Sequence, residues 1–229
     1  FSSLGNGNTC TSHPLSLQSN VTWTLVTDGS PSYDTGVQGN QGIKVGSTTH
    51  QLKFITYNQD VTQFDNVQNY SFEFWVYVGA QDIGGWGFIG GKSRFWGAND
   101  GGIFILNNGT EWGVHSSNGS GGVVDMPANG WHHIVYVRDI TDSNCRKFYV
   151  DNSLAFENDG GDGSADHILN NNSALTIGCS TDNTVSNSSA TNYAPKNDFR
   201  YGHARFYTRG LSATMVSRNF NLEKSIYGL

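Results

Sequence analysis

The stretch NYSFEFWVYV, residues 69–78, carries the clearest strand pattern in the chain. Successive side chains of a strand point to opposite faces of the sheet. One face would carry Phe72, Phe74, Val76 and Val78, and the other Glu73, Trp75 and Tyr77. Because both faces are largely apolar, this strand is expected in the middle of a layered sandwich. Glu73 is expected to face solvent or a neighbouring polar group rather than to be a lone buried carboxylate.

Other strand-like stretches follow the same alternation and are separated by Gly- and Asn-rich turns. They are VTWTLV (21–26), WGFIGGK (86–92), IFIL (103–106), EWGVHSS (111–117), WHHIVYVRD (131–139), KFYVDNSLAF (147–156), ALTIG (174–178) and HARFYT (203–208). WHHIVYVRD and KFYVDNSLAF are predicted to form a hairpin around the polar tip TDSNC. Many short strands at this spacing indicate a sandwich or barrel, with function carried by long loops at roughly 79–102 and 157–173.

One helix is predicted, from Leu211 to about Phe220, with Ser212 as its N-cap. Its inward face would be formed by Met215, Val216 and Phe220. The chain shows no internal repeat and no clear linker, so a single domain over residues 1–229 is expected. Residues 1–50 either complete the sandwich with further strands or form an arm that docks on a partner.

The composition agrees with an all-β fold and excludes several functions. Only 14% of the residues are charged, against about 25% in an average globular protein, while 29 Gly, 13 Phe, 10 Tyr and 6 Trp supply turns and core. A net charge of −6 argues against binding to the phosphate backbone of nucleic acid. No run of about 18 apolar residues is present, so no membrane insertion is expected.

The N-terminal residue and the three cysteines do not determine the cellular compartment. The chain begins at Phe1 rather than Met, which we expect of a processed product or an excised fragment. Cys10, Cys145 and Cys179 allow at most one disulfide, and the absence of a C-x-x-C pair makes a structural zinc site unexpected.

Five stretches occur in an order that forms a larger pattern. They are FEFWVYV (72–78), GWHHIVYVRD (130–139), KFYVDNSLAF (147–156), LTIG (175–178) and HARFYTRGLSATMVSRNFN (203–221). Together they resemble the laminin-G-like branch of the concanavalin A-like lectin and glucanase superfamily over about residues 69–221. The resemblance implies a jelly-roll sandwich of two antiparallel sheets. Asn152, where the family usually has Gly, and Ala204, in place of a bulkier residue, depart from the pattern without threatening that fold.

The chain is also similar in style to modules in surface and tail proteins of marine tailed viruses. The ending NFN-x-x-K, residues 219–224, is common in those modules. This similarity implies a location on a virion or another extracellular surface.

His132 and His133 are candidates for a metal or catalytic pair because they are adjacent. On a regular strand, however, neighbouring side chains point to opposite faces, so the two rings cannot bind one metal ion. We therefore expect Trp131 and the two histidines to be framework residues at the start of a strand, packed and hydrogen-bonded.

Catalytic residues are not expected, and the chain is interpreted as not being an enzyme. The glucanase branch carries an E-x-D-x-x-E type strand, and retaining hydrolysis needs two carboxyl groups about 5–5.5 Å apart. The four glutamates, Glu73, Glu111, Glu157 and Glu223, lie more than five residues apart. No G-x-S-x-G motif occurs, and no Gly-rich turn opens a phosphate-binding helix.

Calcium is the metal that the sequence suggests. The loop ENDGGDGSAD, residues 157–166, contains Asp159, Asp162 and Asp166 in a Gly-rich setting that can supply carboxylate and carbonyl oxygens. Many laminin-G-like domains hold calcium at a loop edge, so the resemblance implies the same. The alternative is that Asp and Gly stand here simply as good turn residues.

A sugar-binding platform is predicted in GGWGFIGGKSRFWGAND, residues 84–100. An exposed aromatic ring can stack on a sugar ring while polar groups bind its hydroxyls, and the candidates are Trp86, Arg94, Trp96, Asn99 and Asp100. The alternative is that both tryptophans cover the edge of the sandwich as core residues.

The sequence thus predicts a non-catalytic recognition or structural module on a virion or other extracellular surface. It would bind a glycan or a neighbouring protein through edge loops. One alternative is a self-assembling coat or filament subunit, whose partner is a second copy. The other is a polysaccharide hydrolase or lyase on the same fold.

Overall fold

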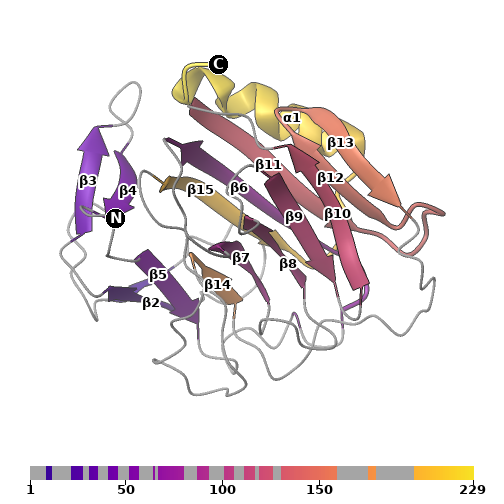
Figure 1. The fold of residues 1–229 in the computed structure, drawn as a ribbon, viewed down its shortest axis with the longest axis horizontal. Helices are drawn as coiled ribbons and strands as arrows, with labels where there is room; N and C mark the ends of the chain where they lie inside the picture. Colours follow the sequence, from indigo (N-terminus) through magenta and orange to yellow (C-terminus); the bar gives the residue numbers. More distant parts are fainter. Residues whose placement is uncertain are drawn as a thin grey trace.

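The computed structural model is a sandwich of two antiparallel sheets with one helix on its outer side (Figure 1). It describes residues 9–11, 22–27, 31–35, 41–45, 52–56, 64, 67–79, 87–92, 101–105, 111–116, 119–125, 130–158, 175–178 and 199–229. The prediction of an all-β jelly-roll sandwich with a short C-terminal helix is confirmed. Within the described part, no helix is long and apolar enough to cross a membrane.

The first sheet has eight strands. In spatial order they are β1 (Thr9–Thr11), β2 (Thr22–Thr27), β5 (Leu52–Thr56), β14 (Leu175–Ile177), β7 (Gly87–Lys92), β8 (Gly101–Ile105), β9 (Glu111–Ser116) and β10 (Gly119–Asp125). Every pairing is antiparallel.

The second sheet has seven strands. In spatial order they are β13 (Ser153–Asn158), β12 (Arg146–Val150), β11 (Gly130–Arg138), β6 (Tyr70–Val78), β15 (Phe199–Tyr207), β4 (Gln41–Val45) and β3 (Pro31–Thr35). Its pairings are antiparallel as well. Strands β1–β4, from the first fifty residues, belong to the two sheets, β1 and β2 to the first and β3 and β4 to the second.

Strand β6 lies at the centre of the second sheet and has the alternation that its sequence predicts. Its inner face packs into the core between the sheets, where Phe72, Phe74, Val76 and Val78 are fully buried. The first sheet contributes Ile103, Trp112 and Val114 to the same core. Because aromatic rings prefer edge-to-face contacts, Phe74 and Phe206 meet at 5.5 Å with their planes at 89°.

The outer face of the second sheet is covered by α1 (Ala213–Glu223), followed by a short 3₁₀ helix, Lys224–Ile226 (Figure 1). Ser212 caps α1 as predicted, since its Oγ accepts from the backbone N–H of Met215 at 3.3 Å. Val216 is fully buried and Phe220 half-buried, as expected. The prediction for Met215 is wrong: its side chain is 37% exposed, because it lies away from the sheet-facing side of the helix.

KFYVDNSLAF forms two strands, β12 and β13, and not one continuous strand. The chain reverses at Asp151 and Asn152, whose φ angles of 48° and 69° are left-handed. Asn and Asp tolerate this region better than other residues with a Cβ, and two such residues make the tight turn that matches strand twist. Asn152 thus occupies a position that suits the glycine usual in the family.

Strand β10 was not predicted. Its first residues, GSGG, carry no β-branched or aromatic side chain and look like a turn. Pairing with β9, with a register shift between Ser120 and Val123, makes it a strand nonetheless. Tertiary pairing therefore overrides the local preference of these glycines.

Candidate functional site

The predicted ligand-binding residues all lie outside the described residues. These are Trp86, Arg94, Trp96, Asn99 and Asp100 for a glycan, and Asp159, Asp162 and Asp166 for calcium. Strand β7 lies within the predicted long loop of 79–102 and separates Trp86, which precedes it, from Arg94. Within the described part, no cluster of three or more His, Cys, Asp or Glu side chains could hold a metal.

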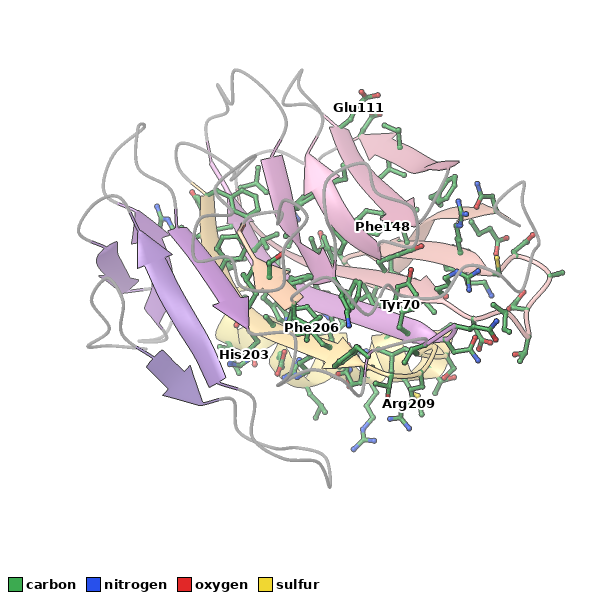
Figure 2. The ribbon with its side chains drawn as sticks, turned by 90° about the horizontal axis from the view of Figure 1, so that it is seen from below. Tyr70, Glu111, Phe148, His203, Phe206 and Arg209 are labelled. Carbon is green, nitrogen blue, oxygen red and sulfur yellow. The ribbon has the colours of Figure 1, made fainter. Side chains whose placement is uncertain are left out.

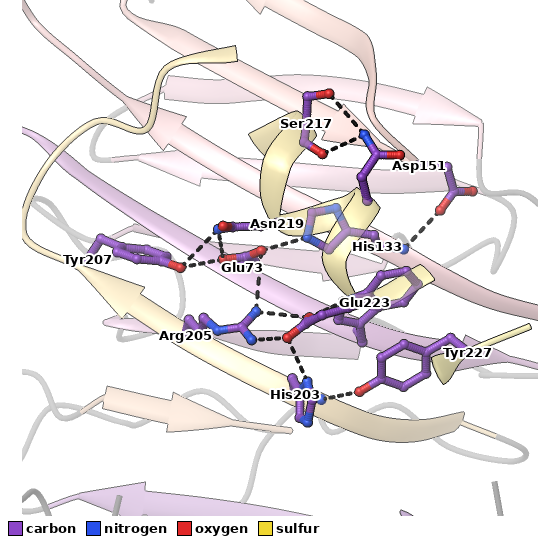
Figure 3. Close-up of polar contacts among 12 residues, drawn as sticks. Glu73, His133, Asp151, His203, Arg205, Tyr207, Ser217, Asn219, Glu223 and Tyr227 are labelled. Atoms are coloured by element: carbon purple, nitrogen blue, oxygen red, sulfur yellow. Dashed lines mark hydrogen bonds and ion pairs between the residues drawn. The ribbon is translucent and has the colours of Figure 1, made fainter. Parts of the chain in front are cut away.

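A buried polar network lies between α1 and the outer face of β6, β11 and β15 (Figure 3). The sheet contributes Glu73, Trp75, His133, Arg205 and Tyr207, and the helix contributes Asn219 and Glu223. It is the largest group of interacting titratable side chains among the described residues. These residues form the candidate site.

Glu73 is the centre of this network and is 1% exposed. One oxygen accepts from His133 Nε2 at 2.7 Å. The other accepts from the Tyr207 hydroxyl at 2.6 Å and from Asn219 Nδ2 at 3.0 Å. The expectation that Glu73 faces a polar group is confirmed, and the alternative that it faces solvent is wrong. Sheet pairing places Arg205 directly opposite Glu73 and so brings a positive charge beside it.

Glu223, at the end of α1, anchors the helix to the sheet in a similar way. It accepts from the indole N–H of Trp75 at 2.7 Å and from His203 Nδ1 at 3.1 Å. Arg205 donates to both of its oxygens, with Nη1 at 3.0 Å from Oε2. The guanidinium of Arg205 thus lies between two carboxylates, 3.5 Å from Glu73 and in direct contact with Glu223 (Figure 3).

Both carboxylates remain ionised because donors outweigh the cost of burial. Burial alone would raise the pKa of Glu223, but hydrogen bonds from His203 and Arg205 and the charge of Arg205 hold it at about 2. The same balance, with His133 and Tyr207 as donors, lowers the pKa of Glu73 below its usual value. Burial and the charge of Glu73 raise the pKa of Tyr207, so its hydroxyl keeps the proton that it donates.

Two apolar clusters pack beside the network. On one side Val135, Val137, Tyr149, Leu211 and Val216 pack together. On the other side lie Trp75, Trp131 and Tyr227. The Tyr227 ring stacks on Trp75 at 4.2 Å and lies over Gly202, where a Cβ would come within 2.5 Å of its hydroxyl. Gly202 therefore permits the close approach of this ring.

The two adjacent histidines are framework residues on opposite faces, as predicted. His133 binds Glu73 on the outer face. His132 Nδ1 instead donates to Asp151 Oδ2 at 2.7 Å, and the backbone N–H of His133 donates to Asp151 Oδ1 at 2.9 Å. Asp151 thus ties the β12–β13 turn to the start of β11.

The arrangement stabilises the docked helix and is poorly suited to acid–base chemistry. A general acid needs a raised pKa so that it carries a proton at neutral pH, whereas the pKa of both Glu73 and Glu223 is lowered. Glu73 and His133 stand out in the sequence, but their partners in the network do not. A usable signal was present, since Val216, Asn219, Phe220 and Glu223 recur at the spacing of one helix face.

A match between the amino-acid sequence and a family model supports the same fold. The model of the Laminin_G_3 family, described as the concanavalin A-like lectin/glucanases superfamily, matches residues 53–217. This range includes β5 to β15 and the start of α1. No curated protein sequence matches the chain.

Solved structures with the same fold include toxin and sialidase chains. A structure of botulinum neurotoxin type C, whose cell entry depends on interaction with two ganglioside molecules, is 12% identical with a TM-score of 0.58, over 93% of this chain and 51% of that one. The sialidase of Trypanosoma rangeli in complex with the inhibitor DANA is 14% identical with a TM-score of 0.60, over 91% and 30%. The chain therefore spans about half the length of the toxin chain and less than a third of the sialidase chain. At these identities the likeness is one of fold.

Proposed function

Because the chain belongs to the concanavalin A-like lectin/glucanases superfamily, we propose that it is a non-catalytic module that binds a glycan through loops at the edge of the sandwich. One observation carries the choice between lectin and glucanase. The buried carboxylates of the described residues, Glu73 and Glu223, are ionised and committed to holding α1. Their lowered pKa values make both poorly suited to be the protonated acid that glycoside hydrolysis requires.

Recognition is then assigned to the loops, which a rigid sandwich presents at its ends. The leading candidates lie in the segment that follows β7 and are Arg94, Trp96, Asn99 and Asp100. Trp96 would stack on a sugar ring, and the polar side chains would bind hydroxyl or carboxylate groups. Trp86, on the other side of β7, would act separately. Asp159, Asp162 and Asp166 would hold a calcium ion that orders their loop.

Two proteins with the same fold support sialylated glycans as the first class of ligand to test. Gangliosides, named for the botulinum neurotoxin, are glycolipids that carry sialic acid, and the T. rangeli sialidase has been solved with sialic acid. A surface with few charges suits an extracellular or virion setting, where salt screens ion pairs.

The test is a glycan array probed with the purified chain, once with calcium and once with a chelator. Binding to one class of sugar, lost in Trp96→Ala but kept in Leu222→Ala, would establish a lectin site in the loop after β7. Leu222 is a suitable control because it is a large apolar side chain on α1 that is 65% exposed. Loss of binding in chelator and in Asp162→Asn would assign the calcium site.

A blank array under both conditions would overturn the glycan proposal. Sedimentation of the same sample would then distinguish assembly with a second copy from recognition of a different protein. Release of reducing sugar from any arrayed polysaccharide would contradict the proposed absence of catalysis.

A further inference from the structure

A row of polar side chains crosses four neighbouring strands at one end of the second sheet. Register pairs Tyr70 on β6 with Arg138 on β11, Arg138 with Arg146 on β12, and Arg146 with Asn158 on β13. Paired residues in an antiparallel ladder point to the same face. Tyr70 packs into the core (Figure 2), and the row that shares its face therefore points into the interior of the sandwich. It lies beside an aromatic row that includes Phe72, Tyr136 and Phe148.

This row places two positive charges side by side in the interior. Arg138 is 2% exposed and Arg146 is 1% exposed. A guanidinium does not lose its proton inside a protein, so it cannot escape burial by becoming neutral. Like charges directly opposite each other in a ladder are also unfavourable. Arg146 has an interaction of its own, so Arg138 is the residue of the row whose charge is left to be balanced.

Arg138 lacks a negative partner within the described part of the chain. Its Nη1 donates to the backbone carbonyl of Gln68 at 2.8 Å, and none of the described ion pairs includes it. Its buried Nε has no hydrogen-bond acceptor, and Oδ1 of Asn158 has no donor. Tyr70 does not supply the charge, since burial raises the pKa of its phenol well above the usual value.

We propose that this row binds a small inorganic oxyanion of the sulfate or phosphate class, with Arg138 as its principal ligand. A planar guanidinium matches two oxygens of such an ion at once. Arg146 adds a second positive charge, the Tyr70 hydroxyl can donate, and the Asn158 carboxamide presents its NH₂ after a flip. The site uses none of the residues proposed for glycan binding and would stabilise the end of the sandwich at which β11 and β12 join.

The test is the melting temperature of the purified chain, in chloride buffer of constant ionic strength, as sulfate or phosphate is added up to the low-millimolar range. General salt effects of sulfate are small at such concentrations. An ion that binds only the folded state raises the melting temperature by about 5 °C or more at a hundredfold excess over Kd. Calorimetric titration should give one ion per chain.

Arg138→Met should abolish the response and should melt at or above the wild-type temperature in chloride alone, because a buried charge is removed. Arg209→Gln, which removes one exposed charge, should respond like the wild type. If Arg138→Met does not fold, Arg138→Lys decides, since it keeps the charge but lacks the planar fork and should bind at least tenfold more weakly. A wild-type chain without a response, or an Arg138 variant with the full response, would overturn the proposal.

Discussion

Glu73 shows how a charged residue is held inside an apolar sheet. Water is replaced by three donors, from His133, Tyr207 and Asn219, and by the nearby charge of Arg205. An isolated carboxylate in this position would cost many kcal/mol or take up a proton. The side chain is therefore stable only while all of its partners are in place.

Glu73→Gln should lower the free energy of unfolding by about 3 kcal/mol, because it leaves buried donors facing an NH₂ group and Arg205 with less counter-charge. Urea unfolding measures this change, with Glu157→Gln as the control. Glu157 is an exposed carboxylate on β13, and its substitution should change stability by less than about 0.5 kcal/mol. Equal effects of the two substitutions would show that the network contributes little.

For single residues, the sequence predicts the sheet face on which a side chain lies better than it predicts which residues that side chain contacts. Alternation along 69–78 places Glu73 on the face away from Phe72 and Phe74, and adjacency places His132 and His133 on opposite faces. Nothing local indicates that His133 would meet Glu73, 60 residues away, or that Asn219 would meet it across 146 residues. Such contacts depend on strand order and register, which one sequence does not specify.

Among the elements, α1 depends most on interactions outside itself. It has 11 residues, and isolated helices shorter than about 12–15 residues are marginal in water. Its position is fixed by the cap at Ser212, the buried Val216 and the contacts of Glu223 with Trp75 and Arg205. Loss of the Glu223 charge should therefore loosen the helix from the sheet.

Docking of α1 should weaken in acid. The pKa of Glu223 is lowered from 4.5 to about 2 in the folded chain, so its contribution is complete above about pH 4.5 and is lost as the pH falls towards 2. That contribution is up to about 3 kcal/mol. Glu73, whose pKa is also lowered, acts in the same direction.

Urea unfolding at several pH values, followed by tryptophan fluorescence, measures this loss because the Trp75 indole donates directly to Glu223. Glu223→Gln should be less stable at neutral pH and should lose less stability than the wild type on acidification. Glu157→Gln should follow the wild-type curve. A Glu223→Gln curve parallel to the wild type would contradict the assignment.

The sequence predicted elements well where side-chain patterns are strong. β6, β11 and the capped helix stand close to their predicted bounds, because aromatic and β-branched alternation and a Ser cap are local signals. β10 was missed because its glycines carry no such pattern. The predicted glycan and calcium sites stay predictions, since loop composition suits ligands and turns equally well.

For the whole molecule, the sparse charge has a measurable consequence. Only 14% of the residues are charged, and the ion pairs of Arg205 with Glu73 and Glu223 are largely buried, where salt screens them little. The unfolding midpoint should therefore change little between low sodium chloride and seawater-like salt. A midpoint that fell sharply with added salt would instead show that exposed ion pairs stabilise the fold.

The polar network also joins parts of the chain that the ribosome makes at different times. β6 is made before Arg205, Tyr207, Asn219 and Glu223, and the hydrogen bond from Trp75 to Glu223 closes a gap of 148 residues. Until α1 leaves the ribosome, the outer face of β6 and β11 stays uncovered, with Glu73 and Trp75 open to water. A chain that stalls before residue 219 therefore exposes apolar surface to chaperones and proteases, and a chain that has added α1 does not.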